Sequence, residues 1–285
     1  MRERDLRPHL LAQPNLNGRV ELAAIDTAGT PLMKSRQRAE QHLAGGLSDE
    51  LRALTDIVHA NHDIAGQGVK VLLVLQGLDG SGKNGTIRHV ATKIDPAIVR
   101  VASFKEPTEN EEEHHFLWRI RQELPEPGQM VIFDRSHYED LIVPLVTGDP
   151  DRTVIDQRIG EVNQFETDLV SDATVVIKCL LHLSYAEQRS RFLRRLRRDD
   201  KRWKFAVSDL DTRDQWAQFQ AAYGEIAGAT STSVAPWYVI PSDHKWYRNW
   251  AVASIIVETL RDLDLSYPQP DLDIAALCQR LSPHL

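Results

Sequence analysis

Apolar residues are gathered in short runs along the chain, and the most continuous run is VKVLLVLQ at Val69–Gln76. A strand that is buried on both faces of a parallel sheet has this pattern, with Val and Leu predominating. Shorter runs follow at spacings that leave room for helices, and they predict four more strands: Val99–Phe104, Met130–Asp134, Thr174–Leu181 and Trp237–Ile240. The pattern therefore predicts a five-stranded parallel sheet.

Stretches with helical apolar spacing lie between these runs. They predict helices at Lys83–Thr92, Glu109–Glu123, Gln157–Leu169, Tyr185–Arg198, Asp211–Ala227 and Trp246–Leu260. Strands that alternate with helices are typical of an α/β domain whose sheet is flanked by helices, and we assign residues 67–285 to it. Residues 1–66 show no strong strand pattern but contain a predicted helix at Leu51–Ile64, so we expect an N-terminal helical extension.

The composition narrows the class of protein. Of 285 residues, 42% are hydrophobic and 26% are charged, which excludes a disordered, fibrous or membrane protein. The net charge of −7 argues against a general nucleic-acid coat protein. The two cysteines, Cys179 and Cys278, make neither a disulfide framework nor a zinc site, and we expect Cys179 to be buried and reduced. The N-terminus lacks a signal-peptide pattern, so a cytoplasmic protein is expected.

A glycine-rich segment directly follows the first predicted strand. Residues 77–83, here named the phosphate loop, read GLDGSGK and fit the pattern G-x-x-x-x-G-K. Glycines let backbone N–H groups point at phosphate oxygens, the following helix N-terminus adds a partial positive charge, and Lys83 supplies a full one. An ordinary turn with an incidental lysine is the alternative, but a strand before the segment and a helix after it favour phosphate binding.

Two positions depart from the usual phosphate-loop pattern. Asn84 stands where Ser or Thr normally supplies a hydroxyl ligand to Mg²⁺. Asp79 places a carboxylate inside the loop, where it would repel phosphate unless a cation lay between them. We infer that Asp79 faces a magnesium-bound phosphate or the acceptor phosphate, with a solvated turn residue as the alternative.

A second carboxylate, Asp134, ends the predicted strand Met130–Asp134. In phosphate-loop proteins an Asp at the end of a neighbouring strand holds magnesium, and Asp134 fits that role. Arg135 follows directly and is placed to contact a transferring phosphoryl group. The alternatives are a helix N-cap for Asp134 and a structural ion pair for Arg135.

Residues 189–204 form a strongly basic segment, RSRFLRRLRRDDKRWK. Its nine basic and two acidic residues give +7, so the remainder of the chain, which totals −7, carries −14. We predict a helix in which Phe192 and Leu196 anchor one face. Because arginine binds phosphate through paired hydrogen bonds, we predict a lid at about residues 186–212 that closes over a polyanion. A solvated helix face and a nucleic-acid surface are the alternatives, the latter without the aromatic interleaving such surfaces use.

Several segments together resemble the family-2 polyphosphate kinases, over roughly residues 24–260. They are LLVLQGLDGSGKNGTIRHV (72–90), VASFKEPTENEEEHHFLWRI (101–120), MVIFDRSHYEDLIVPLV (130–146), RFLRRLRRDDKRWKFAVSDLDTRDQW (191–216) and APWYVIPSDHKWYRN (235–249). The resemblance implies a P-loop kinase fold close to thymidylate kinase. It also implies phosphoryl transfer between inorganic polyphosphate and a nucleotide, with Mg²⁺ or Mn²⁺ as cofactor, and a homo-oligomer, either a dimer or a tetramer.

The resemblance also implies roles for individual residues. Catalytic roles are expected for Asp79, Lys83, Asp134 and Arg135, with Asp79 and Asp134 as the Mg²⁺ ligands. Phosphate or nucleotide contacts are expected from Gly77, Gly80, Ser81, Gly82, Asn84, Gly85, Thr86, Lys105 and Glu139. The lid is expected to grip polyphosphate through Arg191, Arg194, Arg195, Arg198 and Lys204.

The segment SHYED at 136–140 resembles the class that accepts nucleoside mono- and diphosphates, whereas the diphosphate-specific class tends to have SWYNR. Two positions differ from the broader class: Asp134, where Asn is frequent, and Glu106, where a basic residue is frequent. The predicted function is a polyphosphate kinase that converts AMP and ADP to ATP. A diphosphate-specific enzyme and an ATP-dependent nucleotide or small-molecule kinase are the alternatives, and we expect neither nucleic acid nor membrane as a partner.

Overall fold

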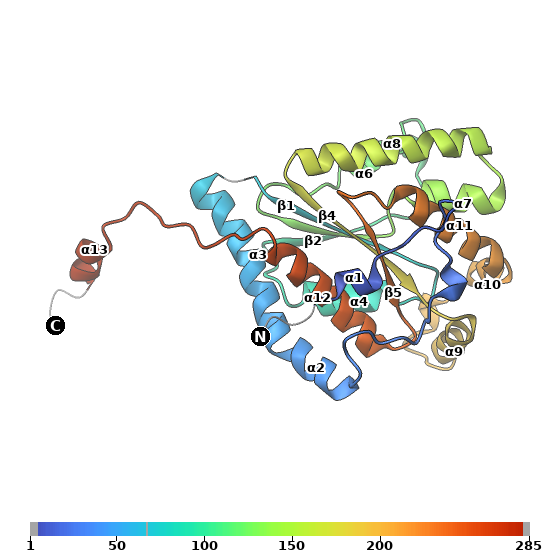
Figure 1. Ribbon diagram of the computed structural model, residues 1–285, viewed down its shortest axis with the longest axis horizontal. Coiled ribbons are helices and arrows are strands. Elements are labelled where there is room, and N and C mark those ends of the chain that lie inside the picture. The colour runs from blue at the N-terminus through green and yellow to red at the C-terminus, as the bar shows by residue number, and fades with distance from the viewer. Residues whose placement is uncertain (1–4, 67, 282–285) are drawn as a thin grey trace.

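Five parallel strands form the centre of the computed structural model, which describes residues 5–66 and 68–281 (Figure 1). The strands are β1 (Lys70–Gln76), β2 (Val99–Ser103), β3 (Met130–Asp134), β4 (Thr174–His182) and β5 (Trp237–Pro241). Their order in the sheet is β2-β3-β1-β4-β5, and all four pairings are parallel. The predicted five-stranded parallel sheet is confirmed, and each strand lies at its predicted position to within about one residue.

The central strand β1 faces a hydrophobic core on each side. Leu72 and Val74 belong to one core, while Val71, Leu73 and Leu75 belong to the other. Since side chains alternate along a strand, one continuous apolar run supplies both cores. One core is covered by α2 (Arg36–Ala44), α3 (Gly46–Ala65), α4 (Lys83–Ala91) and α12 (Lys245–Arg261), and the other by α7 (Glu139–Thr147), α8 (Arg152–Ser171) and α11 (Trp216–Thr230).

The N-terminal residues pack on both sides of the sheet. The helix α1 (Arg7–Leu10) brings Leu10 into the core beside α12, and η1 (Leu22–Ala24) brings Leu22 into the core beside α11. Between them, the Ala12 N–H donates a hydrogen bond to Trp237 O at 2.8 Å on the edge strand β5. The predicted boundary between extension and kinase domain falls at Gln67, which lies outside the described residues, as do residues 1–4 and 282–285 of the predicted ranges.

The helix predicted over Glu109–Glu123 is wrong as a single element. Two short helices, α5 (Glu109–Glu112) and α6 (Trp118–Arg121), replace it. Thr108 and Glu111 form a capping box that starts α5. The acidic side chains of this turn favour a helix N-terminus but oppose its C-terminal dipole, so the helix ends after one turn.

Two further helices are shorter than predicted. The range Asp211–Ala227 is divided into α10 (Ser208–Asp214) and α11, and buried Arg213 near the break donates to Tyr185 O and Gln188 Oε1 of the helix at 185–196, both at 2.8 Å. The helix predicted at Tyr185–Arg198 is α9 (Tyr185–Leu196), whereas the rest of the basic segment, expected to be helical through Lys204, contains only the 3₁₀ turn η2 (Arg202–Lys204). Successive like charges one helical turn apart disfavour a longer helix.

The C-terminal helix α13 (Ile274–Leu281) stands away from the rest of the chain and has no buried residue (Figure 1).

Cys179 is buried and Cys278 is exposed, both as free thiols, which confirms the expectation for Cys179. Burial raises the pKa of the Cys179 thiol, so it stays protonated and inert. None of the helices within residues 5–66 and 68–281 combines the length and apolar character needed to cross a bilayer.

Candidate active site

The phosphate loop lies between β1 and α4 at the carboxyl end of the sheet. Lys83 is buried, and its Nζ donates a hydrogen bond to Gly77 O at 2.5 Å. Gly77 has a φ of +140°, and a Cβ there would lie 2.6 Å from Leu181 O, so only glycine fits where the chain leaves β1. The buried Ser81 hydroxyl has no hydrogen-bond partner within the described chain. The loop and the first turn of α4 also contain the other predicted glycines: Gly80, Gly82 and Gly85.

Asp79 and Arg135 form an ion pair in which Arg135 Nη2 lies 3.2 Å from Asp79 Oδ1 and 3.3 Å from Oδ2. Burial alone would raise the pKa of Asp79, but the charges of Lys83 and Arg135 outweigh it and hold the pKa below its ordinary value. Burial would lower the pKa of Arg135, but the carboxylates of Glu139 and Asp79 raise it. Two of the predicted catalytic residues therefore meet as an ionised pair beside the loop lysine.

Asp134 ends β3, and the sheet register places it opposite Leu75 of β1. Asn84 Nδ2 donates to Asp134 Oδ2 at 3.3 Å, so the residue that replaces the usual Ser or Thr contacts the second predicted metal ligand. Mg²⁺ takes oxygen ligands, commonly one or two carboxylates completed by phosphate oxygens and water. Asp79 and Asp134 supply such carboxylates, and the described residues contain no cluster of three or more candidate ligands that would form an all-protein cage. The donor set fits a Mg²⁺ ion shared with a phosphate.

Glu139 begins α7 and anchors the turn that follows β3. Gln76 Nε2 donates to Glu139 Oε1 at 2.9 Å, while Gln76 Oε1 accepts from Ser136 Oγ at 3.1 Å. Burial raises the pKa of Glu139, although the charge of Arg135 acts in the opposite direction. Arg135 has a φ of +64°, a left-handed conformation that costs a non-glycine residue free energy. The anchored turn holds this strained residue so that its guanidinium reaches Asp79.

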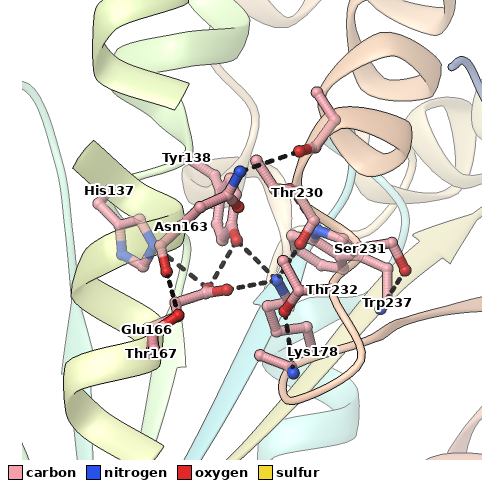
Figure 2. Close-up of polar contacts among 12 residues, drawn as sticks. His137, Tyr138, Asn163, Glu166, Thr167, Lys178, Thr230, Ser231, Thr232 and Trp237 are labelled. Carbon is pink, nitrogen blue, oxygen red and sulfur yellow. Dashed lines mark hydrogen bonds and ion pairs between the residues drawn. The ribbon is translucent and has the colours of Figure 1, made fainter. Parts of the chain in front are cut away.

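A buried polar network lies behind this turn and joins α8, β4 and the residue before α7 (Figure 2). Lys178 Nζ donates to Glu166 Oε2 at 2.6 Å, to Tyr138 Oη at 2.9 Å and to Thr230 O at 2.7 Å. Tyr138 Oη donates in turn to Glu166 Oε1 at 2.6 Å. Burial lowers the pKa of Lys178. Burial would raise the pKa of Glu166, but the positive charge of Lys178 outweighs this effect and lowers the pKa of Glu166. The network fixes Tyr138 directly before Glu139.

A cavity of about 590 Å³ opens beside the phosphate loop, between the end of β2 and the helices α7, α10 and α11. Its volume is in the range of small-molecule sites. The predicted residue Lys105 lies in its wall, and Lys105 O accepts a hydrogen bond from Arg119 Nη1 at 2.8 Å. The wall of the cavity contains cationic side chains, which suit the phosphates of a nucleotide, and aromatic rings, which suit its base. Acidic side chains also line the cavity. The lining includes Asp79, Phe104, Arg119, Arg135, Glu139, Arg158 and Tyr223.

The predicted lid corresponds to α9, η2 and α10 with their connections, and part of it faces the phosphate loop. Arg195 lies close enough to help lower the pKa of Asp79. The pKa of Lys204 is lowered, mainly by burial and further by nearby cations of the lid and of α4. Several positive charges therefore lie close together around Lys204. Arg194 is exposed, and Arg198 forms an ion pair at 2.8 Å with the aspartate two residues on.

Three predicted residues lie differently from the sequence expectation. Arg191 is buried beneath the loop, where it donates to backbone carbonyls, so it does not belong to the open face of the lid. Leu196 is 41% exposed and does not anchor α9, whereas Phe192 is buried as predicted. Thr86 Oγ1 donates to Asn249 Oδ1 at 3.3 Å and so points towards α12. A run of charges or a motif position does not reveal which side chains turn inward.

Sequence reasoning missed several groups in the cavity wall. Arg119 pairs with Asp140 at 3.3 Å, and Arg158 Nη1 donates to Asp140 O at 3.0 Å. Tyr223 is buried on α11. A lone arginine within the apolar stretch FLWRI was a usable signal for Arg119. Tyr223 gave no such signal, because an aromatic residue at helical spacing is ordinary core.

A parallel sheet of this order, with a phosphate loop after its central strand and carboxylates beside that loop, defines a P-loop kinase. The chain belongs to the polyphosphate kinase 2 family, because the family model described as Polyphosphate kinase 2 (PPK2) matches residues 44–267. The matched range includes the phosphate loop, Asp134 and the lid.

Two relatives are similar to this chain over about nine tenths of their own length. The chain is 43% identical over 255 residues to the AMP/ADP-polyphosphate phosphotransferase of Meiothermus ruber, covering 90% of this chain and 94% of that protein. It is 34% identical over 263 residues to the ADP-polyphosphate phosphotransferase of Rhodopseudomonas palustris, covering 88% and 89%. The crystal structure of polyphosphate kinase 2 from Arthrobacter aurescens TC1 superposes with a TM-score of 0.90 at 34% identity, covering 96% of this chain and 98% of that one.

Proposed function

We propose that this polyphosphate kinase transfers the terminal phosphoryl group of inorganic polyphosphate to AMP, forming ADP, and to ADP, forming ATP, and that each transfer shortens the polyphosphate by one phosphate. The observation that carries the proposal is the convergence of the ionised pair Asp79–Arg135, the loop lysine Lys83 and the lid residue Arg195 beside one cavity. Cationic groups on both sides of that cavity suit two phosphate chains facing each other. The name of the Meiothermus ruber relative supports transfer to both acceptors, and the name of the Rhodopseudomonas palustris relative supports transfer to ADP.

The proposed mechanism is positioning with electrostatic stabilisation. The nucleotide occupies the cavity, its terminal phosphate facing the phosphate loop, and polyphosphate lies under the lid. A nucleotide phosphate is largely ionised at neutral pH, so no strong general base is needed. Lys83 and Arg135 stabilise the charge on the equatorial oxygens of the transferring group, and Arg195 holds the donor chain. Mg²⁺ or Mn²⁺ bound by Asp79 and Asp134 would neutralise phosphate charge and let the two polyanions approach.

An acceptor range limited to diphosphates is the second candidate. Glu106 lies in the cavity wall and adds a negative charge where a further acceptor phosphate could extend. The Rhodopseudomonas palustris relative carries a diphosphate name. We favour the broader range because the Meiothermus ruber relative is more similar and the segment at 136–140 reads SHYED.

Chromatographic product analysis tests the proposal. The protein is incubated with Mg²⁺ and long-chain polyphosphate, with AMP, ADP, GMP or GDP added singly, and ATP is expected from both AMP and ADP. Formation of ATP from ADP alone would move the chain to the diphosphate-specific class. Product from ATP as sole donor, and none from polyphosphate, would support an ordinary nucleotide kinase. The variant K83M is the control and is expected to lose activity about 10²- to 10³-fold.

We further propose that the enzyme is a cytoplasmic homo-oligomer, a dimer or a tetramer, that binds neither nucleic acid nor membrane. The family resemblance supports the homo-oligomer and the location, and the net charge of −7 argues against binding to nucleic acid or to an anionic membrane. Light scattering after size-exclusion chromatography gives the oligomer size. A gel shift with duplex DNA at about 200 mM salt is expected to show no binding.

A further inference from the structure

A guanidinium group without an acidic partner lies beneath the phosphate loop. Arg248 of α12 is only 2% exposed. Its Nη1 donates to Ser81 O at 2.9 Å, while Nε and Nη2 donate to Asn249 Oδ1 at 3.2 and 2.9 Å. Within residues 5–66 and 68–281 no carboxylate forms an ion pair with it, and burial followed by the charge of Arg191 lowers its pKa to about 9. The group therefore remains charged at neutral pH although its burial is costly.

A second guanidinium group reaches the same carbonyl from the lid helix α9. Arg191 Nη1 donates to Gly80 O at 2.9 Å and to Ser81 O at 2.8 Å. Its Nη2 donates to Ser242 O at 2.5 Å, and its Nε donates to Glu187 Oε1 at 2.8 Å. The Ser81 carbonyl is thus held by two arginines from different helices.

Because the peptide unit is planar and trans, the contact at the Ser81 carbonyl also fixes the direction of the next N–H group in the loop. The C=O and N–H of one peptide unit point in opposite directions. Since Ser81 O is held against the two guanidinium groups, the N–H of Gly82 points away from them, to the opposite side of the loop. Gly82 has a φ of +105°, and a Cβ there would overlap Arg248 Nη1. Glycine is required because the guanidinium group packs against the backbone.

We propose that Arg248 is a positioning residue that sets the affinity of the phosphate loop for phosphate chains, by holding the Ser81–Gly82 peptide with its N–H towards the anion and by placing a buried positive charge behind it. The role deepens the proposed function and rests on it for the identity of the substrate. Arg248 touches no reacting atom; it acts through the backbone, with Asn249 fixing the guanidinium plane. The lid-borne Arg191 completes the contact.

Binding of inorganic tripolyphosphate tests this role without phosphoryl transfer. The full chain and its variants are compared by titration calorimetry and by spectra of glycine-selectively ¹⁵N-labelled protein, in which the Gly82 amide reports on the loop. R248M is expected to raise Kd at least about tenfold and to weaken the Gly82 response. R248K keeps the charge but not the paired contacts, and an intermediate Kd is expected.

The matched control is R261M, on the same helix, where Arg261 pairs with Glu50 at the surface. It is expected to leave Kd unchanged. N249A, which releases the guanidinium plane but keeps the charge, is expected to raise Kd about threefold and replaces R248M should that variant fail to fold. A folded R248M with wild-type Kd, an equal change in R261M, or wild-type protein that binds no tripolyphosphate would overturn the inference.

Parallel assays of ATP formation separate this inference from the proposed function. Wild-type protein that forms ATP from polyphosphate, together with an unchanged Kd in R248M, overturns the role of Arg248 and leaves the proposed function. Wild-type protein that forms no ATP, together with weaker tripolyphosphate binding by R248M, supports the role and overturns the proposed function.

Discussion

Lys178 and Glu166 form an ion pair that is almost completely removed from solvent. Removing one partner of such a pair leaves an uncompensated charge in the core, whereas replacing both by apolar groups avoids that cost. K178M is therefore expected to lower the free energy of unfolding by about 3–5 kcal/mol. The double variant K178M/E166L is expected to be more stable than K178M. Urea denaturation measures both, and equal destabilisation of the two variants would contradict this account.

Glu258 gives the stability of the enzyme a pH dependence near neutrality. Burial and then a hydrogen bond with Asp5 raise the pKa of Glu258 from 4.5 to about 7, and Leu6 N donates to its Oε2 at 3.1 Å. The folded protein therefore holds this proton more tightly than the unfolded chain does. The resulting stability is complete below about pH 4.5 and is lost as the pH rises through 7.

The variant E258Q is expected to lose less stability than wild-type protein between pH 5 and pH 8. Denaturation in urea at each pH unit measures the two curves. E40Q removes an exposed acid on α2 and controls for the change in net charge. Parallel curves for wild type and E258Q would show that the proton on Glu258 does not matter.

At the scale of elements, the N-terminal chain passes unusually close to α11. A Cβ at Gly228 would overlap Gly18 O and lie 2.9 Å from Arg19 Cα, so the backbone itself blocks a side chain. Overpacking of this kind typically costs about 1–3 kcal/mol, and G228A is expected to destabilise by that amount. Gly160 on α8 has open space around its Cβ position, and G160A is expected to stabilise by up to about 1 kcal/mol. Urea denaturation that gives the same sign for both would refute the contact.

The elements differ in how well the sequence predicts them. Four strands were predictable because each is a short apolar run that is buried on both faces, as Val71–Leu75 shows, whereas the edge strand β2 is largely exposed and was predictable from its apolar residues alone. The ends of α4 and α12 were predicted to within one residue, but other helix ends were not, because they depend on contacts distant in sequence. The break between α10 and α11 is associated with Arg213 bonding to α9, and nothing local to residues 211–227 marks it.

At the scale of the whole molecule, the residues of the site also divide into those that the sequence predicts and those that depend on contacts distant in sequence. The places of Asp79 and Asp134 were predictable because Asp79 follows β1 and Asp134 ends the neighbouring parallel strand β3, and the carboxyl ends of these strands share one edge of the sheet. Arg248 contacts Ser81 across 167 positions of sequence, and only the packing of α12 under the loop brings them together. Motifs reveal groups that face a ligand, whereas groups that hold those motifs in place from behind require the fold.

Charge is also organised over the whole molecule. Residues 189–204 carry +7 on a chain of −7, so a polyanion is attracted to one region and repelled by the remainder. Binding of a long phosphate chain to several cations releases counterions, which makes affinity fall steeply with salt. We expect the KM for long-chain polyphosphate to rise about tenfold or more between 50 and 200 mM salt, and the KM for ADP, with few phosphates, to rise much less.

The lid, not the overall charge, should set this slope. A triple variant, R194Q/R195Q/R198Q, removes three lid cations and is expected to flatten the plot of log KM for polyphosphate against log salt by about two to three units. The matched control is R36Q/R38Q/R52Q, which removes three arginines from α2 and α3 and has the same net charge as the lid variant. These three arginines lie on α2 and α3 and do not line the cavity, and solvent ions screen exposed charges from one another, so the matched variant should keep the wild-type slope. Equal slopes for both variants would mean that polyphosphate responds to net charge and that the lid does not grip it.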